Sequence, residues 1–258
     1  MDKNISKSIT SEVVGSLVDY GFTSLAVAAG FPPAVLAVPF VKGVVLGLLE
    51  SCYNECAQKT LSIRESHKLS QVSLAALKTF RELAEKDNVL AWEMQMTPEL
   101  IDYSFEVAEH ATIEAIRQSD NAKVDILGRY YAKQLYGGSH SCQDMHQIIS
   151  MTSSMTLRQI VMIYLITSGF DGYDQNMFIT NPSACVEINR LQDYGIWKSH
   201  GAAFGRDESA AIRLANLDPT DYSFMLSREL MLEKLSESDV KRTIKSLGLS
   251  LDRKERRC

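Results

Sequence analysis

The stretch Phe22–Leu49, FTSLAVAAGFPPAVLAVPFVKGVVLGLL, organises the rest of this chain. It carries one charged residue, Lys42, although 23% of the whole sequence is charged. Its apolar residues run all round a helix rather than along one face. A segment of this kind must be removed from water in a protein core, against a partner or in a bilayer. The sequence alone leaves these three alternatives open.

Glycine and proline divide this stretch into two helices that we expect to form a hairpin over residues 11–49. Gly30 is suited to end the first helix, and Pro32 and Pro33 then force an extended turn. The second helix becomes polar in its second half and is predicted to continue to about residue 66. Neither arm offers the roughly 20 clean apolar residues of a simple transmembrane helix. A full membrane span is therefore disfavoured.

Hydrophobic periodicity predicts a series of amphipathic helices after the hairpin. Apolar residues recur at spacings of three and four from Leu69 to Leu83, and Thr97-Pro98-Glu99 is a strong helix start. Later helices are predicted over residues 98–118, 121–137, 142–153 and 156–168. Together these segments predict a helical domain over residues 1–168.

The pattern changes after Gly169. Pro182 starts a helix, an extended run follows at Ile196, and a returning strand is predicted over residues 211–214. A helix followed by a two-stranded hairpin is the order found in a winged-helix unit. We therefore predict a mainly α fold: a helical bundle with the N-terminal apolar hairpin and a small winged-helix-like α+β unit. This second domain covers residues 169–258 and includes the C-terminal helices.

Charge and cysteine content narrow the classes of function. The net charge of −5 argues against a general affinity for nucleic acid. The five cysteines are irregularly spaced, unlike the disulfide framework of a small secreted domain. Asp19 also interrupts the first apolar run, which disfavours a signal peptide. We expect a cytoplasmic protein, with peripheral association with the inner membrane as an option.

Two segments carry a family resemblance, ILGRYYAKQLYG (residues 126–137) and SMTLRQIVMIYLI (residues 154–166). With the order of the predicted elements, they resemble bacterial helical proteins grouped with abortive-infection factors of the Abi-alpha type. The resemblance covers about residues 30–200. It rests on Tyr130, Tyr131, Ala132, Leu135, Leu157, Arg158, Gln159 and Ile160. These residues look structural, so the resemblance implies phage defence but no catalytic residue.

His140, Cys142 and His146 form the sharpest cluster of candidate metal ligands. Cys142 and His146 are four residues apart and share a helix face, so the three side chains would suit zinc. A structural zinc site needs a fourth ligand, which Cys185 or His110 would have to supply through folding. We favour the alternative, a capped helix N-terminus with surface histidines, and expect no metal or other cofactor.

The sequence carries no recognisable catalytic motif. It contains no G-x-S-x-G nucleophile elbow, no P-loop and no G-x-G-x-x-G after a predicted strand. Cys52 and Cys56 share a helical face, and we interpret them as core or interface residues. A non-enzymatic role is therefore expected.

The main functional hypothesis is a non-enzymatic interaction or membrane-associated effector that uses the hairpin. Residues near its tip would insert into a partner or membrane: Phe31, Val35, Leu36, Phe40, Val41 and Lys42. The expected partner is another protein or a second copy of the chain, with a membrane surface as an alternative.

The second hypothesis is a nucleic-acid- or protein-binding regulator that acts through the winged-helix-like unit. Its candidate nucleic-acid contacts are Arg190, Lys198, His200, Arg206 and Arg213. Acidic residues near them in the sequence dilute the positive charge, and nucleic acid is not the expected partner.

Overall fold

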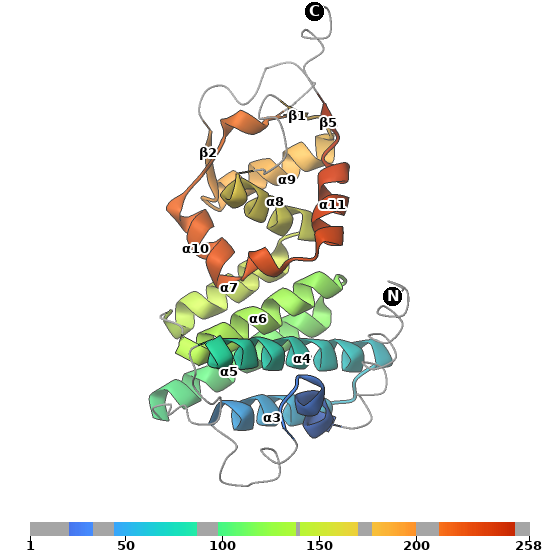
Figure 1. The fold of residues 1–258 in the computed structure, drawn as a ribbon, viewed down its shortest axis with the longest axis vertical. Coiled ribbons are helices and arrows are strands. Elements are labelled where there is room, and N and C mark those ends of the chain that lie inside the picture. The colour runs from blue at the N-terminus through green and yellow to red at the C-terminus, as the bar shows by residue number, and fades with distance from the viewer. Residues whose placement is uncertain are drawn as a thin grey trace, which may run out of the picture. The chain divides into compact units, whose positions relative to one another are not determined.

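The computed structural model describes residues 21–32, 44–86, 98–137, 140–169, 177–199 and 212–250 (Figure 1). These residues are mainly helical, with short strands confined to the C-terminal part. The chain divides into two compact units between Ser154 and Met155. The sequence placed this division after residue 168. The boundary lies earlier because α8 (Leu157–Ser168) packs with the elements that follow it.

The N-terminal unit is a bundle of helices. A short helix over residues 21–28 comes first among the described residues. The helices that follow are α3 (Val44–Ala57), α4 (Ile63–Lys86), α5 (Pro98–Arg117), α6 (Asn121–Gly137) and α7 (Cys142–Ser154). The most extensive pairing joins α4 and α6, and α5 packs against α3, α4, α6 and α7. Leu77, Phe80 and Tyr130 are among the fully buried side chains of this core.

The boundary between two predicted helices lies earlier in the structure. The sequence predicted an uninterrupted helix to about residue 66, but α3 ends at Ala57 and α4 begins at Ile63. Ser62 caps α4: the Glu65 N–H donates to Ser62 Oγ (3.3 Å), and the Ser62 N–H donates to Glu65 Oε2 (2.8 Å). This capping box satisfies free donors at the helix start. Its Ser-x-x-Glu signature was present in the sequence and was missed.

The predicted amphipathic helices are confirmed. In α4, Leu69, Val72, Ala76 and Phe80 are buried and Leu83 is half-buried. In α6, the predicted stripe of Val124, Leu127, Tyr131 and Leu135 is buried throughout. Cys52 and Cys56 are also buried in α3, in agreement with their interpretation as packing residues.

α4 and α6 approach most closely at Gly128. A Cβ atom at this position would lie 2.5 Å from the Val72 carbonyl oxygen and 2.9 Å from the Ala75 Cβ. Both distances are below normal van der Waals separation, and one of the two atoms belongs to the backbone. Only glycine therefore allows α4 and α6 to pack at this spacing.

Polar side chains also join α4 to α6. Gln71 Nε2 donates to Asp125 Oδ1 (2.9 Å) and to the Asn121 carbonyl oxygen (3.0 Å). Burial raises the pKa of Asp125, and the Gln71 bond and nearby cations oppose this shift only in part. The ionised form of Asp125 is therefore less stable in the folded protein than in the unfolded chain.

The C-terminal unit is built around α8. This helix contacts α9 (Pro182–Asp193), α10 (Asp221–Glu229) and α11 (Glu237–Ser246). Its buried apolar side chains are Ile160, Val161, Met162, Ile163, Leu165 and Ile166. A capping box between Thr156 and Gln159 begins the helix, and left-handed Gly169 ends it. The prediction of a mostly apolar helix at this place is confirmed.

Five short strands form two antiparallel sheets in the described part of this unit. β1 (Phe178–Ile179) pairs with both β3 (Ile212–Arg213) and β5 (Leu249–Ser250), and β2 (Trp197–Ser199) pairs with β4 (Leu217–Pro219). The predicted hairpin between the strand at Ile196 and the strand at 211–214 is therefore wrong, because β2 and β3 belong to different sheets. β1 was not predicted, because the stretch of sequence around it resembles a loop. In the structure, β1 is the strand that pairs with β3.

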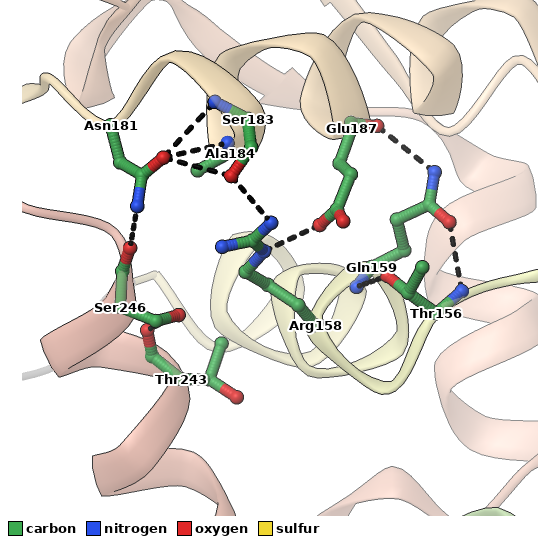
Figure 2. Close-up of polar contacts among 9 residues, drawn as sticks. All are labelled: Thr156, Arg158, Gln159, Asn181, Ser183, Ala184, Glu187, Thr243 and Ser246. Carbon is green, nitrogen blue, oxygen red and sulfur yellow. Dashed lines mark hydrogen bonds and ion pairs between the residues drawn. The ribbon is translucent and has the colours of Figure 1, made fainter. Parts of the chain in front are cut away.

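A polar network joins the start of α8 to α9 and α11 (Figure 2). Arg158 donates from Nε to Glu187 Oε2 and from Nη2 to Ser183 Oγ. Asn181 caps α9 through its Oδ1, and its Nδ2 donates to the Ser246 carbonyl oxygen (2.8 Å). The side chains of Arg158 and Glu187 are only 21% and 18% exposed, so water screens this ion pair weakly.

Gly128→Ala is expected to destabilise the protein by about 1–3 kcal/mol, because the added methyl group overpacks the contact between α4 and α6. Gly47→Ala in α3 is the control, since a Cβ there meets nothing within 4 Å. Alanine at this helical position should be neutral or stabilising by up to about 1 kcal/mol. Urea unfolding followed by circular dichroism measures both changes. Equal effects of the two substitutions would contradict the close approach.

Asp125→Asn is expected to raise the urea midpoint at neutral pH. The native pKa of Asp125 lies above its ordinary value of 3.8, so its contribution to stability is lost as the pH rises through the native pKa. Asparagine removes the buried charge and keeps an oxygen that can accept from Gln71. The advantage of the variant should shrink as the pH is lowered from neutral toward the native pKa. If the variant is less stable than wild type at neutral pH, then burial does not outweigh the Gln71 bond and the nearby cations in setting the pKa of Asp125.

Arg158→Met is expected to cost about 1.5–3 kcal/mol of stability, the usual range for a hydrogen bond to a charged group. The control is Lys241→Met, which removes an ion pair with Glu237 whose side chains are 70% and 80% exposed. That substitution should change stability by no more than about 0.5 kcal/mol. Thermal or urea unfolding of the full chain compares the two variants. If Arg158→Met costs as little stability as the control, the polar network around Arg158 does not stabilise the fold.

Candidate functional site

The described part of the predicted hairpin, residues 21–32, packs against other helices of the N-terminal unit. In residues 21–32, the buried side chains are Phe22, Leu25, Ala26, Ala29 and Phe31. Val27 lies on the other face of the short helix and is 43% exposed. The first apolar arm is therefore buried along one face where the structure describes it.

Two contacts hold this arm in place. The Phe22 ring packs on the ring of Tyr53 in α3, with 6.1 Å between their centroids. Arg81 in α4 donates from Nη1 to the Ala29 carbonyl oxygen (3.2 Å), at the end of the short helix. Gly30 has φ +91°, and a Cβ there would overlap the Arg81 guanidinium. Gly30 thus ends the helix as predicted, and its lack of a side chain leaves room for the Arg81 guanidinium.

The residues predicted to insert into a membrane or partner are only partly described. Phe31 is 3% exposed, so in this conformation it is a core residue and would have to leave the unit to insert. Val35, Leu36, Phe40, Val41 and Lys42 lie outside the described residues. Among the described residues, no single helix is long and apolar enough to cross a membrane, and α7 and α8 reach that length only when they are taken together.

The basic residues of the C-terminal unit are spread over several elements. Arg190 on α9, Lys198 on β2 and Arg213 on β3 are exposed, whereas His200 and Arg206 lie outside the described residues. A wing would carry Lys198 and Arg213 on paired strands, but β2 and β3 belong to different sheets. The predicted nucleic-acid surface therefore gains no specific support.

A different cluster forms between α5 and α7. Glu106, Cys142 and His146 each place one possible metal-ligand atom within 4.8 Å of the others. His110 Nδ1 lies 2.7 Å from His146 Nδ1, and the two rings are tilted by 35°. Glu106 is exposed, and the other three side chains are half-buried. The cluster thus combines carboxylate, thiol and imidazole groups at the surface of the helical unit.

Helix geometry explains why these four side chains meet. Glu106 and His110 are one turn apart on α5, and Cys142 and His146 are one turn apart on α7. Glu106 faces Cys142 and His110 faces His146, so the contacts advance in the same direction along both helices. α5 and α7 therefore run parallel, and each offers a pair of side chains to the other.

Further along, a polar contact keeps the two helices in this register. Ser153 of α7 accepts from Gln118 Nε2 (2.6 Å) and donates to Glu114 Oε2 (2.5 Å). Lys123 Nζ donates to the Ser153 carbonyl oxygen (2.7 Å), so α6 takes part as well. The cluster therefore lies on rigid helices with a fixed relative placement.

The charges in the cluster act on one another. Burial, and to a lesser extent the Glu106 carboxylate, raises the pKa of the Cys142 thiol. Burial and the neighbouring His146 ring lower the pKa of His110. At 2.7 Å, one Nδ1 must carry the proton and the other must accept it. The isolated cluster therefore favours a neutral thiol and a neutral His110.

The structure changes the set of metal ligands that the sequence proposed. Cys142 and His146 belong to the cluster, and His110 arrives through folding as one of the two expected alternatives. His140 lines a small neighbouring cavity with Tyr103 and Met145 instead. Cys185 lies in the C-terminal unit, where its Sγ donates to the Ile179 carbonyl oxygen.

Sequence reasoning missed Glu106 entirely. A signal was available, since EVAEH (residues 106–110) and CQDMH (residues 142–146) each place two candidate ligands four residues apart. Such pairs share a helix face, but only the tertiary fold determines which two faces meet.

No known protein family, no curated protein and no solved structure matches this chain. The resemblance to Abi-alpha proteins therefore stays a prediction.

Proposed function

We propose that this protein is a non-enzymatic, membrane-associated effector that acts through the apolar hairpin, residues 11–49. In the described conformation, residues 21–32 of the first arm are held against α3 and α4. In the active conformation it leaves the unit and inserts its apolar tip into a membrane surface. The observation that carries this proposal is the position of Arg81, which bridges α4 to the end of the first arm at Ala29.

The energies involved are compatible with a releasable arm. Each apolar side chain that leaves the core loses about 1.5–3 kcal/mol unless another apolar environment receives it. The arm is therefore retained in water, and a bilayer can compensate the loss. The bond from Arg81 adds only about 0.5–1.5 kcal/mol, because the Arg81 side chain is 41% exposed and water screens the contact. Loss of this one bond would then shift the equilibrium from the packed arm toward the inserted arm.

The tip supports a membrane rather than a catalytic role. The stretch from Phe22 to Leu49 has Lys42 as its one charge, and a lysine can extend to the headgroup layer while its apolar neighbours insert. Bacterial phage defence is the setting that we propose, and it rests on the Abi-alpha resemblance alone. A protein partner or a second copy of the chain is the alternative receiver of the hairpin.

Arg81→Met is expected to increase several-fold the fraction of full-length protein that floats with anionic liposomes, because it removes the bond that holds the first arm. Arg64→Met is the control, since it removes an exposed positive charge from the same helix. Adding Phe31→Asp to Arg81→Met should abolish the gain, because an aspartate at the tip opposes insertion. Circular dichroism at the flotation temperature confirms that each variant is folded.

Two outcomes would refute the membrane proposal. In the first, the folded Arg81→Met variant remains monodisperse and does not float, so the arm is an ordinary part of the core. In the second, it forms larger oligomers without floating, so the hairpin is received by another copy of the chain.

A further inference from the structure

We propose that Glu106, Cys142 and His146 bind a zinc ion between α5 and α7, and that His110 is a positioning residue that orients His146. The proposal is independent of the membrane role. It concerns a site in the helical unit whose residues all lie in the described part of the chain.

The donor set suits zinc better than other common metal ions. One thiolate, one imidazole and one carboxylate mix soft and hard ligands, and zinc accepts all three. Magnesium and calcium prefer oxygen ligands and would not recruit Cys142. Three protein ligands leave the fourth tetrahedral position for water or another small ligand.

The present distances are close to those that zinc requires. Zinc bonds of about 2.0–2.3 Å place tetrahedral ligand atoms about 3.3–3.6 Å apart. The three ligand atoms now lie within 4.8 Å of one another. Closing the remaining gap of about 1 Å requires side-chain rotation rather than movement of helices. Glu106 is exposed and can rotate freely, whereas Cys142 and His146 are already placed by α7.

His110 fits a supporting role better than that of a fourth ligand. Its Nδ1 lies 2.7 Å from His146 Nδ1, which is shorter than the separation of about 3.3 Å between two nitrogens on one zinc ion. The contact instead matches a hydrogen bond between the rings, which leaves Nε2 of His146 for the metal. Histidine ligands commonly use their second nitrogen in this way, and the partner fixes the ring orientation.

The charge of the cluster favours a cation. As ligands, the Glu106 carboxylate and the Cys142 thiolate would each carry one negative charge, and a cation between them would offset their mutual repulsion. A zinc ion would neutralise both and join α5 to α7 at a second point beyond the Ser153 contact. Zinc that binds only the folded chain must then stabilise it.

The experiment is a zinc titration of the reduced full-length protein against a chromogenic chelator, with cobalt as a spectroscopic substitute. Wild type should bind one equivalent of zinc, and its cobalt form should show a thiolate-to-cobalt charge-transfer band. Cys142→Ser should remove that band. Glu106→Gln and His146→Ala should each weaken zinc binding by more than about 100-fold. His110→Ala should weaken it by about 10–100-fold and retain the band, as expected for an outer partner of a ligand.

Two variants serve as matched controls. His140→Ala removes the histidine that the sequence grouped with Cys142, and Cys185→Ser removes a buried thiol in the other unit. Both should bind zinc and cobalt as wild type does. Circular dichroism of every variant shows whether a loss of binding reflects a loss of fold, and wild-type thermal stability should rise with added zinc.

Several results would overturn the proposal. The proposal is refuted if wild type fails to compete with the chelator, or if Cys142→Ser retains the cobalt band. If His140→Ala weakens binding while Glu106→Gln leaves it unchanged, the ligand set predicted from the sequence is the correct one. If His110→Ala binds as tightly as wild type, the positioning role of His110 is refuted.

Discussion

The helical unit depends on the close approach of α4 and α6, which a side chain at Gly128 would prevent. At this spacing, the backbone of α4 lies within contact distance of α6. At this spacing, Leu77 and Phe80 of α4 and Ile126 and Leu127 of α6 are fully buried. Because interiors are packed as tightly as molecular crystals, a wider spacing would open voids beneath the remaining helices. The packing of α5 against both α4 and α6 rests on this pair.

Both proposed activities use the outer parts of this bundle. Residues 21–32 of the first arm contact α3 and α4 through Tyr53 and Arg81. The cluster of Glu106, Cys142 and His146 lies between α5 and α7. One site is apolar and the other is charged, so they offer different chemistry to the surroundings. A rigid bundle can support both, because fixed helices position short side chains accurately.

Much of the helical organisation could be predicted from local sequence signals. The stripes of α4 and α6 were visible as three- and four-residue spacings, and Thr97-Pro98 and Gly169 mark helix ends that the structure contains. The break at Ser62 was missed although its capping signature was present. Strand pairing was missed for a different reason. β1 is two residues long, too short for alternation to be visible, and its partners β3 and β5 are distant in sequence.

The sequence by itself determined which faces of the helices are apolar, where most of them begin and end, and that Cys142 and His146 share one face. These properties follow from periodicity and capping, which act within a few residues. Only the tertiary structure decided that α8 belongs to the C-terminal unit, that Phe31 is buried, and that Glu106 and His110 lie opposite Cys142 and His146. The reason is physical. Local sequence determines the chemical character of a helix face, but the close packing of the whole unit determines which other face contacts it.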